Sequence, residues 1–404
     1  MRTRAALAFV SFFLLLCSYF ILRPVRDEMG VQSGAGKLQW LFTGTFVATL
    51  VAVPIFGAVV ARVRRRLLLP VVYGFFITNL IAFHFAMRSG PVSLATAATF
   101  FIWLSVFNLF VVSLFWSTAS DVFTTEESHR LYGFIAAGGT AGAFTGPALT
   151  AVLARNTSTA NLIAISTVLF TLATIAATML ARTAGTREGR EIRIGGGLLA
   201  GIRLTLQSPT LAGIALLVIC YTTVSTFLYF EQAEIVRRTI SDSGERTAFF
   251  ATIDLLVNGV ALFVQLTLTS IVVRRFGVRT ALVVVPLLLL AGFFLIAIWP
   301  VPVMVAAVQI AHRAGDFSLG KPSREMIYTT VDAESRYKAK NFIDTTVYRG
   351  NDAVAGWITA AIRTGGLGAL AAAGAAVALV WSITGYRIGR RHDERRIESV
   401  VEPA

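Results

Sequence analysis

Apolar stretches of membrane-spanning length recur along the whole chain. A helix needs about 20 apolar residues to cross the hydrocarbon core of a bilayer. Stretches of this kind, joined by short polar connections, predict twelve spans at 5–28, 39–61, 67–87, 94–117, 131–153, 160–181, 209–230, 247–272, 279–298, 300–314, 341–363 and 366–385. The pattern therefore predicts an all-α membrane protein with almost no chain left for a separate soluble domain.

Two motifs of similar sequence lie about 205 residues apart. The first reads Phe123-Thr-Thr-Glu-Glu-Ser-His-Arg130, and the second reads Tyr328-Thr-Thr-Val-Asp-Ala-Glu-Ser-Arg336. Basic turns recur at a similar offset, at 62–66 after the second span and at 274–279 after the eighth. Corresponding features in two halves indicate an internal duplication, and paired membrane repeats usually build a solute path at their interface.

The duplication divides the chain into two halves of six spans with the same orientation. We expect an N-terminal half at 1–182, a linker with an amphipathic helix at 183–208, a C-terminal half at 209–386 and a basic tail at 387–404. Six spans repeated once in parallel is the architecture of the major facilitator fold. The sequence therefore predicts twelve transmembrane helices in two parallel six-helix repeats of this type.

The composition agrees with a membrane protein and explains its positive charge. Hydrophobic residues make up 55% of the 404 residues, charged residues only 14%, and the net charge is +14. Most lysines and arginines fall in connections on the side of the N-terminus, which the positive-inside rule places in the cytoplasm. We therefore expect a multi-pass monomer in the lipid bilayer of the bacterial inner membrane, with both termini cytoplasmic and no nucleic-acid partner.

Charged residues cluster at the end of the first span. If the helix continues past Pro24, Arg23 shares one face with Arg26 and Asp27, three and four residues further on. Two guanidiniums against one carboxylate leave surplus positive charge, and planar arginine forks suit phosphate or carboxylate groups. These residues either form an anion site, or snorkel to the headgroups, or tie helices together.

Polar stripes mark the seventh and eighth spans. In the eighth, Asp254, Asn258 and Gln265 project from one side of a helix. Asp254 either carries a proton, or pairs with a basic residue of the other half, or makes a structural hydrogen bond between helices. The seventh span has a face of hydroxyl residues that lines a path or packs helices: Thr222, Ser225, Thr226 and Tyr229.

The eleventh span has the densest polar content. Asp344, Tyr348 and Asn351 share one face, and Arg349 and Asp352 lie one turn apart beside it. A pair between Arg349 and Asp352 lowers the cost of burying both charges. Alternatively, Arg349 faces an anion and Asp344 balances its charge. Both arrangements stay open at this point.

The fifth span carries a ridge of small residues, Gly138, Gly142 and Gly146. Such a ridge permits close contact between helices and the sliding of one packed helix along another.

Motifs of catalysis, nucleotide hydrolysis and metal binding are absent from the sequence. The four histidines have no metal-ligand spacing. The chain has no phosphate-binding loop, no Gly-x-Ser-x-Gly and no His-Glu-x-x-His. We therefore expect no enzyme activity, no catalytic residue, no cofactor and no metal site.

Three passages carry a family resemblance: Leu22-Arg-Pro-Val-Arg-Asp-Glu28, then Phe115-Trp116 through Thr124-Thr-Glu126 to Arg130-Leu-Tyr132, then Lys321-Pro-Ser-Arg-Glu-Met-Ile-Tyr328 through Lys338-Ala-Lys340 to Ile343-Asp344. In order and spacing they resemble the bacterial and plastid ATP/ADP translocases, nucleotide transporters related to the major facilitator fold. In that family a Lys-Asp pair ends the first helix, and basic residues lie near the start of the eleventh. Both are linked with nucleotide phosphates. The resemblance implies these roles for Arg26 with Asp27, and for Lys340 or Arg324.

We therefore hypothesise a secondary transporter that moves an organic anion, such as a nucleotide or another phosphorylated metabolite, by alternating access of two halves. The residues expected to contact the anion are Arg23, Arg26, Arg349, Arg324 and Lys340. Those expected to balance charge or couple an ion are Asp27, Asp254 and Asp344. Two alternatives remain: a proton-coupled facilitator of an unrelated small solute with Asp254 as the titrating group, and a membrane scaffold or sensor that does not transport.

Overall fold

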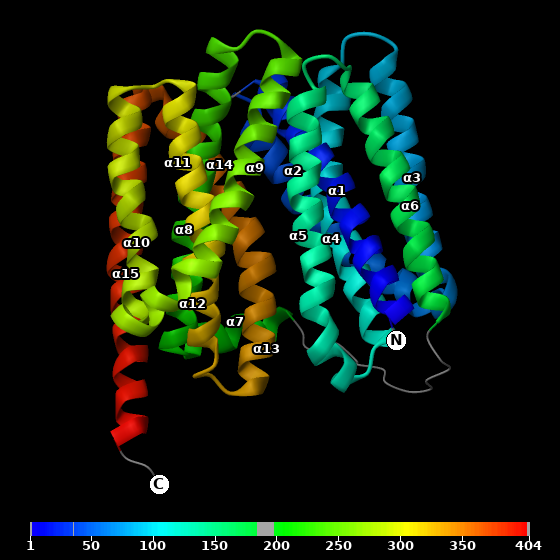
Figure 1. Cartoon of the computed structure of the whole chain (residues 1–404). Helices are drawn as coiled ribbons and strands as arrows, with labels where there is room; N and C mark the ends of the chain where they lie inside the picture. Colours follow the sequence, from blue (N-terminus) through cyan, green and yellow to red (C-terminus); the bar gives the residue numbers. More distant parts are fainter. Residues whose placement is uncertain (1, 35, 184–197, 402–404) are drawn as a thin grey trace. The chain divides into compact units, whose positions relative to one another are not determined.

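The computed structural model describes residues 2–34, 36–183 and 198–401, and all secondary structure in these residues is helical (Figure 1). The α-helices are α1 (Arg2–Ser33), α2 (Leu38–Arg62), α3 (Arg65–Arg88), α4 (Leu94–Val122), α5 (Thr125–Leu153), α6 (Thr159–Arg182), α7 (Leu198–Gln207), α8 (Pro209–Thr239), α9 (Ser243–Thr267), α10 (Thr269–Ile298), α11 (Pro302–Gly315), α12 (Lys321–Tyr328), α13 (Ala333–Asn341), α14 (Tyr348–Ile362) and α15 (Leu367–Val401). Two π-helical segments, η1 (Asp316–Gly320) and η2 (Phe342–Val347), join α11 to α12 and α13 to α14. A 3₁₀ turn, η3 (Arg363–Gly365), follows α14.

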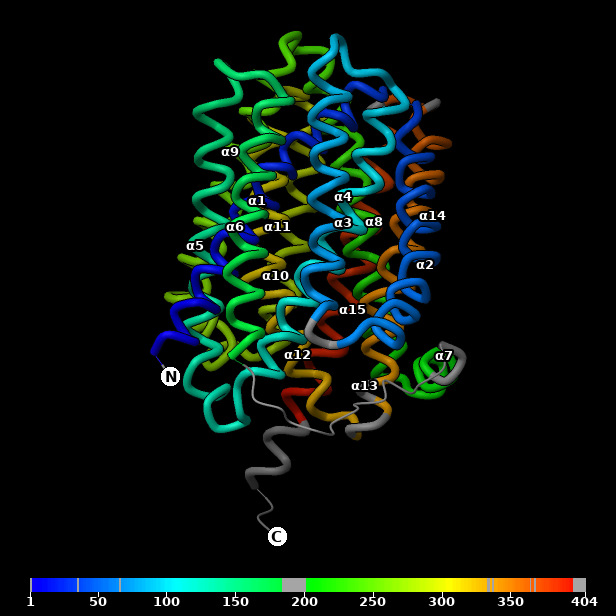
Figure 2. The backbone as a smooth tube through the Cα atoms, turned by 90° about the vertical axis from the view of Figure 1, so that its right-hand side faces the viewer, coloured from blue at the N-terminus to red at the C-terminus, as the bar shows by residue number. Residues whose placement is uncertain are grey.

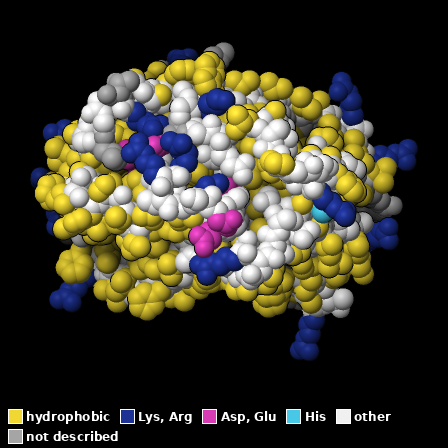
Figure 3. Space-filling view, turned by 90° about the horizontal axis from the view of Figure 1, so that it is seen from above, with side chains coloured by type: hydrophobic (Ala, Val, Ile, Leu, Met, Phe, Trp, Pro, Cys, Tyr) yellow, Lys and Arg dark blue, Asp and Glu magenta, His cyan; other side chains and the backbone are white. Residues whose placement is uncertain are grey.

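Membrane-spanning character is clear in nine helices of the described residues, which are long and apolar enough to cross a bilayer: α1, α2, α3, α4, α6, α8, α9, α10 and α15. The remaining predicted spans are α5, the composite helix from α11 through η1 to α12, and the composite helix from α13 through η2 to α14. Large apolar side chains such as Phe75, Phe85 and Phe294 are exposed, as lipid-facing residues are. Hydrophobic side chains also cover much of the outline in Figure 3.

The predicted end of the tenth span at 314 is wrong. The helix continues through η1 and α12 to Tyr328. The polar residues of η1 and α12 lower the hydropathy of this segment, yet Asp316 and Arg324 are buried in the structure. Hydropathy alone ends a span where charges begin, whereas a helix continues when neighbouring helices surround those charges. The eleventh helix likewise starts at Ala333 rather than at 341.

The chain forms two compact units, which we describe separately. Unit 1 comprises Met1–Lys37, Gly44–Ile192 and Ile240–Leu255, and unit 2 comprises Leu38–Thr43, Arg193–Thr239 and Leu256–Ala404. The first part of α9 therefore packs within unit 1. The division predicted from the sequence, with halves at 1–182 and 209–386, stays a prediction, and residues 184–197 of its linker lie outside the described residues.

Unit 1 is built around α1, which packs against α4, α5 and α6. The glycine ridge of α5 lies directly on α1. A Cβ atom added to Gly138 would lie 2.6 Å from the Phe9 carbonyl oxygen, and one added to Gly146 would lie 2.7 Å from that of Cys17. Glycine thus allows the two backbones to touch. A buried hydroxyl pair, Ser18 with Ser166 at 2.8 Å, joins α1 to α6.

Unit 2 contains a close pair of helices, α10 and α15, which run side by side (Figures 1 and 2). Inside α10, Gly277 has φ of 84° and breaks the helix locally. The carboxylate of Asp393 on α15 accepts hydrogen bonds from the backbone N–H groups of Val278 and Arg279, at 3.0 and 3.2 Å. Asp393 thereby caps the helix where it resumes and anchors α15 to α10.

Each copy of the repeated motif contains the N-cap of a helix. In the first copy, Thr124 is the N-cap of α5 and makes a reciprocal capping box with Glu127. In the second copy, Asp332 is the N-cap of α13 and accepts a hydrogen bond from the Ser335 N–H at 2.9 Å. Both motifs therefore end one long helix and start the next, which is a structural counterpart of the duplication seen in the sequence.

Candidate functional site

Arg23 of α1 lies beside Asp254 of α9 within unit 1. Pro24 lies inside α1 without ending it, so the helix continues through its charged residues to Ser33. The Arg23 Nη1 atom is 3.4 Å from Asp254 Oδ1, and the two side chains are 18% and 1% exposed. The Arg23 guanidinium also lies 5.9 Å from the centre of the Phe20 ring. A deeply buried carboxylate is thus matched by an arginine.

Arg26 pairs with Asp27, its neighbour in the chain. Arg26 donates from Nη2 and Nε to Asp27 Oδ1, at 2.7 and 3.1 Å. Its guanidinium lies over the ring of Phe101 at 5.1 Å from the centre. The structure thus contains the Arg26–Asp27 pair to which the family resemblance pointed.

A third pair at this end of α1 was missed by the sequence analysis. Arg246 of α9 donates to both carboxylate oxygens of Glu28, at 2.6 and 2.7 Å, and Glu28 is fully buried. Arg246 also donates to the carbonyl oxygens of Ile240 and Ser241, both at 3.1 Å. The signal was Glu28 itself, because an acid within a long apolar helix requires a basic partner from another element.

In unit 2, Arg349 of α14 pairs with Asp352 one turn further along. Arg349 Nη1 is 3.6 Å from Asp352 Oδ2, and its guanidinium lies 5.5 Å from the Tyr348 ring centre. Thr226 of α8 donates to the other oxygen of Asp352 at 3.5 Å. The local pair is thus one of the two arrangements left open by the sequence, and the other, in which Arg349 faces an anion and Asp344 balances its charge, stays a prediction.

The polar face of α8 meets α14 through Asn351. Its side-chain amide donates to the hydroxyl oxygens of Thr222 and Thr223, at 2.6 and 2.9 Å, and to the Ile219 carbonyl at 3.0 Å. Thr222, one of the hydroxyl residues predicted to share a face of the seventh span, therefore serves as an interhelical hydrogen-bond partner together with its neighbour Thr223.

Arg324 and Lys340 lie near the junction of α12, α13 and η2. Arg324 Nη2 is 3.9 Å from Asp344 Oδ1, and the Arg324 side chain is 9% exposed. Lys340 makes a 2.5 Å ion pair with Glu325 and lies over the Tyr328 ring. The Arg324 Nε atom is buried and has no hydrogen-bond partner among the described residues. Asp344 belongs to the π-helical segment η2, and such segments are frequent at functional sites.

Buried polar residues of α11 and η1 also escaped the sequence analysis. His312 is fully buried and stacks on Tyr221 with ring centres 5.0 Å apart. Its two ring nitrogens have no hydrogen-bond partner among the described residues. Asp316, the first residue of η1, is buried and lies within electrostatic reach of Arg324. The predicted end of the span at 314 excluded Asp316, which follows in the same helix, whereas His312 lay within the predicted span and was not singled out.

One feature is shared by all five basic residues predicted for the site. Each is paired with a carboxylate: Arg23 with Asp254, Arg26 with Asp27, Arg324 with Asp344, Lys340 with Glu325, and Arg349 with Asp352. Three of the pairs, those of Arg23, Arg324 and Arg349, are separated by 3.4 to 3.9 Å. Charge-assisted hydrogen bonds are typically about 2.7 to 2.9 Å long, so these three are loose ion pairs.

This fold and these buried ion pairs define a multi-pass membrane protein. The sequence matches the family model of the Major Facilitator Superfamily over residues 6–318. Because this match covers well over half of the chain, the protein belongs to the major facilitator superfamily. The predicted fold class is therefore confirmed.

Curated relatives match a shorter region. The chain is 29% identical over 164 residues to ADP,ATP carrier protein 1 of Chlamydia muridarum. It is 27% identical over 164 residues to the protein of the same name from Chlamydia trachomatis serovar D. Each match covers 36% of this chain and spans about a third, 31%, of the relative's length.

Solved structures resemble the whole chain in fold. The nucleoside transporter NupG has a TM-score of 0.70 at 12% identity, with 96% of this chain and 99% of that chain covered. A bacterial homologue of the iron transporter ferroportin, in its inward-facing state, has a TM-score of 0.67 at 14% identity over 96% of this chain and 98% of that chain. At these identities the likeness establishes the fold, and the substrate has to be argued from the residues of this chain.

Proposed function

We propose that this protein transports a phosphorylated organic anion, with nucleotides as the first candidates, across the bacterial inner membrane by alternating access. The observation that carries the proposal is the set of three loose arginine–carboxylate pairs, at Arg23, Arg324 and Arg349. The proposal further includes cytoplasmic termini, a monomeric carrier, and transport without catalysis.

Loose pairs leave room for an anion to compete. A phosphate group carries more charge than one carboxylate and accepts two parallel hydrogen bonds from a guanidinium. Asp254 Oδ1 lies 3.4 Å from Arg23 Nη1, a longer and weaker contact than such a bidentate bond. A phosphorylated substrate can therefore replace the carboxylate at Arg23, and the same reasoning applies at Arg324 and Arg349.

The carboxylates explain how the empty carrier tolerates its arginines. An uncompensated charge buried in a membrane protein is costly, and removal of one partner of a buried pair is strongly destabilising. Asp254, Asp344 and Asp352 neutralise the basic residues when no substrate is bound. Binding of an anion then releases a carboxylate, which is free to change its own partner or protonation.

The curated relatives support a nucleotide as the first candidate. Both are named as ADP,ATP carriers, and the shared region extends over 164 residues. Their bacterial origin agrees with an inner-membrane location. The orientation rests on the basic residues at the connecting turns, which the positive-inside rule assigns to the cytoplasm.

The test is uptake by the purified full chain in liposomes. Vesicles loaded with ADP, with a sugar phosphate or with a dicarboxylate are offered radiolabelled ATP, and the exchange rate is compared with that of empty vesicles. Arg23→Gln removes the anion contact, whereas Arg88→Gln removes a charge from an exposed position at the end of α3. We expect exchange in the wild type and in Arg88→Gln, and its loss in Arg23→Gln.

Other outcomes would redirect the assignment. Uptake of a neutral solute that is driven by a proton gradient and needs Asp254 would favour the proton-coupled alternative. Absence of uptake together with absence of any thermal shift by nucleotides, sugar phosphates or carboxylates would favour the scaffold, because a ligand that binds the folded state raises its apparent stability.

A further inference from the structure

A groove of about 600 Å³ runs along the surface of unit 2 between α10 and α15. Its lining combines apolar, hydroxyl and charged side chains: Val283, Ser382, Ile383, Tyr386, Arg387, Arg390, Arg391 and Glu394. None of these residues belongs to the ion pairs described above. From this groove we infer a second binding site, specific for an anionic phospholipid and independent of the transport function.

Glycines of α15 explain why the groove forms here. A Cβ atom added to Gly385 would lie 3.1 Å from the Leu282 carbonyl oxygen, and one added to Gly389 would collide with the backbone of Arg279. The two helices therefore converge to backbone contact at these positions. Larger residues of α15 form one wall of the groove, and Val283 of α10 belongs to the other.

The groove has a surplus of positive charge. Its one acid, Glu394, accepts a 2.6 Å hydrogen bond from Arg390 Nε. Arg387 and Arg391, one helical turn apart, form no hydrogen bond or ion pair with another side chain in the described part of the chain. Two arginines are thus available to a phosphate, for which the guanidinium fork is well suited.

The order of side chains along α15 matches the order of groups in a phospholipid. The part of α15 that qualifies as a candidate span by length and apolar content has 27 residues, from Gly368 to Glu394, whereas about 20 suffice to cross the hydrocarbon. The last turns, with Arg387 and Arg391, therefore reach headgroup level. Ile383 and Val283 lie at the apolar side, and the hydroxyl group of Tyr386 comes between them and the arginines. The groove thus offers apolar side chains to the acyl chain, a hydroxyl group to the ester and arginines to the phosphate.

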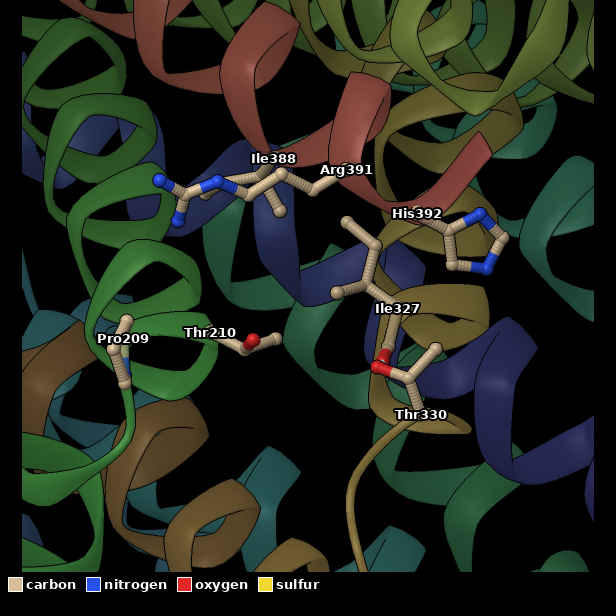
Figure 4. A pocket seen from close by; sticks show the side chains of 7 residues that line it. All are labelled: Pro209, Thr210, Ile327, Thr330, Ile388, Arg391 and His392. Atoms are coloured by element: carbon tan, nitrogen blue, oxygen red, sulfur yellow. The ribbon is translucent and has the colours of Figure 1, made fainter. Parts of the chain in front are cut away.

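Arg391 also borders a second, much smaller space. Figure 4 shows Arg391 reaching over Ile388 toward the start of α8, beside a cavity of about 20 Å³. That volume is enough for about one water molecule and too small for a headgroup. The larger groove is therefore the lipid site, and the apolar wall favours a lipid over a free phosphate ion, which would leave that wall unused.

The test is native mass spectrometry of the full chain in detergent with added phosphatidylglycerol or phosphatidylcholine. Arg387→Gln with Arg391→Gln removes the two arginines of the groove. Arg274→Gln with Arg275→Gln removes two exposed arginines of α10 that do not line it. Each arginine near an anionic lipid contributes about fivefold to affinity, so the groove variant should bind phosphatidylglycerol about 30-fold more weakly. The α10 variant should retain wild-type binding, and phosphatidylcholine should bind weakly throughout.

Three results would each overturn the site. An equal loss of affinity in the α10 variant would mean attraction by general surface charge. Equal binding of the two lipids would mean an apolar groove without headgroup recognition. Competition by glycerol phosphate at the same concentration as the lipid would mean a site for free anions. Thermal unfolding of both variants in detergent verifies that each is folded. Surface substitutions outside the core should leave the unfolding temperature nearly unchanged.

Discussion

Arg23 and Asp254, which come from the first and eighth predicted spans, lie 3.4 Å apart at a point where Asp254 is almost completely buried. The pair is close enough for strong attraction and too long for a good hydrogen bond. This combination suits a site that must be neutral when empty and must give up its internal partner when a substrate arrives.

The first prediction separates the two members of this pair. Arg23→Gln should raise the apparent KM for the anion about 10- to 100-fold, because a hydrogen bond to a charged group contributes about 1.5 to 3 kcal/mol. Asp254→Asn should retain anion binding, since it removes the competing carboxylate. Binding is followed by thermal shift and exchange in liposomes. Loss of binding in both variants would show that the pair maintains the structure and does not contact the substrate.

The second prediction concerns the pair of Glu28 and Arg246. Glu28→Gln should destabilise the protein by about 3 kcal/mol, because it leaves a buried arginine without its carboxylate. Glu126→Gln is the matched control: it breaks an ion pair with Arg130 in which both side chains are mostly exposed, and it should cost less than about 0.5 kcal/mol. Thermal unfolding in detergent measures both. Similar small changes would mean that water reaches Glu28 in solution.

The third prediction compares two glycines of α5 whose substitution should change the stability of the protein in opposite directions. A side chain at Gly142 would collide with the Phe13 carbonyl oxygen and the Cys17 N–H of α1, whereas the space around Gly133 is open. Gly142→Val should destabilise by about 1 to 3 kcal/mol or more, because backbone atoms cannot move aside. Gly133→Ala should stabilise by up to about 1 kcal/mol through helix propensity. Unfolding curves that move in the same direction would contradict the packing of α5 on α1.

The fourth prediction tests the contact of α8 with α14. Asn351→Leu removes the amide that bonds Thr222, Thr223 and the Ile219 carbonyl, and should cost about 0.6 to 1.7 kcal/mol, the range of interhelical hydrogen bonds in membranes. Asn79→Leu removes an amide that bonds the Phe75 carbonyl of its own helix at 2.6 Å, and should cost less. A larger loss for Asn79→Leu would argue against the interhelical role of Asn351.

Several features of the site were predictable from residue type. Charges within apolar spans marked Arg23, Arg26, Asp254 and Arg349, because burial of a charge is costly unless a partner or a cavity receives it. Partner identity was predictable only for neighbours in the chain, as with Arg349 and Asp352. Spacing alone allows Asp27 to pair with either Arg23 or Arg26. Glu28 gave no indication of Arg246, which lies more than 200 residues away in the chain.

By itself, the sequence determined the helical class, the membrane location and the duplicated architecture, because apolar stretch length and the repeated motifs at 123–130 and 328–336 are local properties. Only the tertiary structure decided that α12 continues a membrane helix and that each arginine has its particular carboxylate. Arg324 and Asp344 meet at 3.9 Å because two helices and two π-helical segments pack in a certain register. Register depends on packing over the whole unit, which no local pattern of residues encodes.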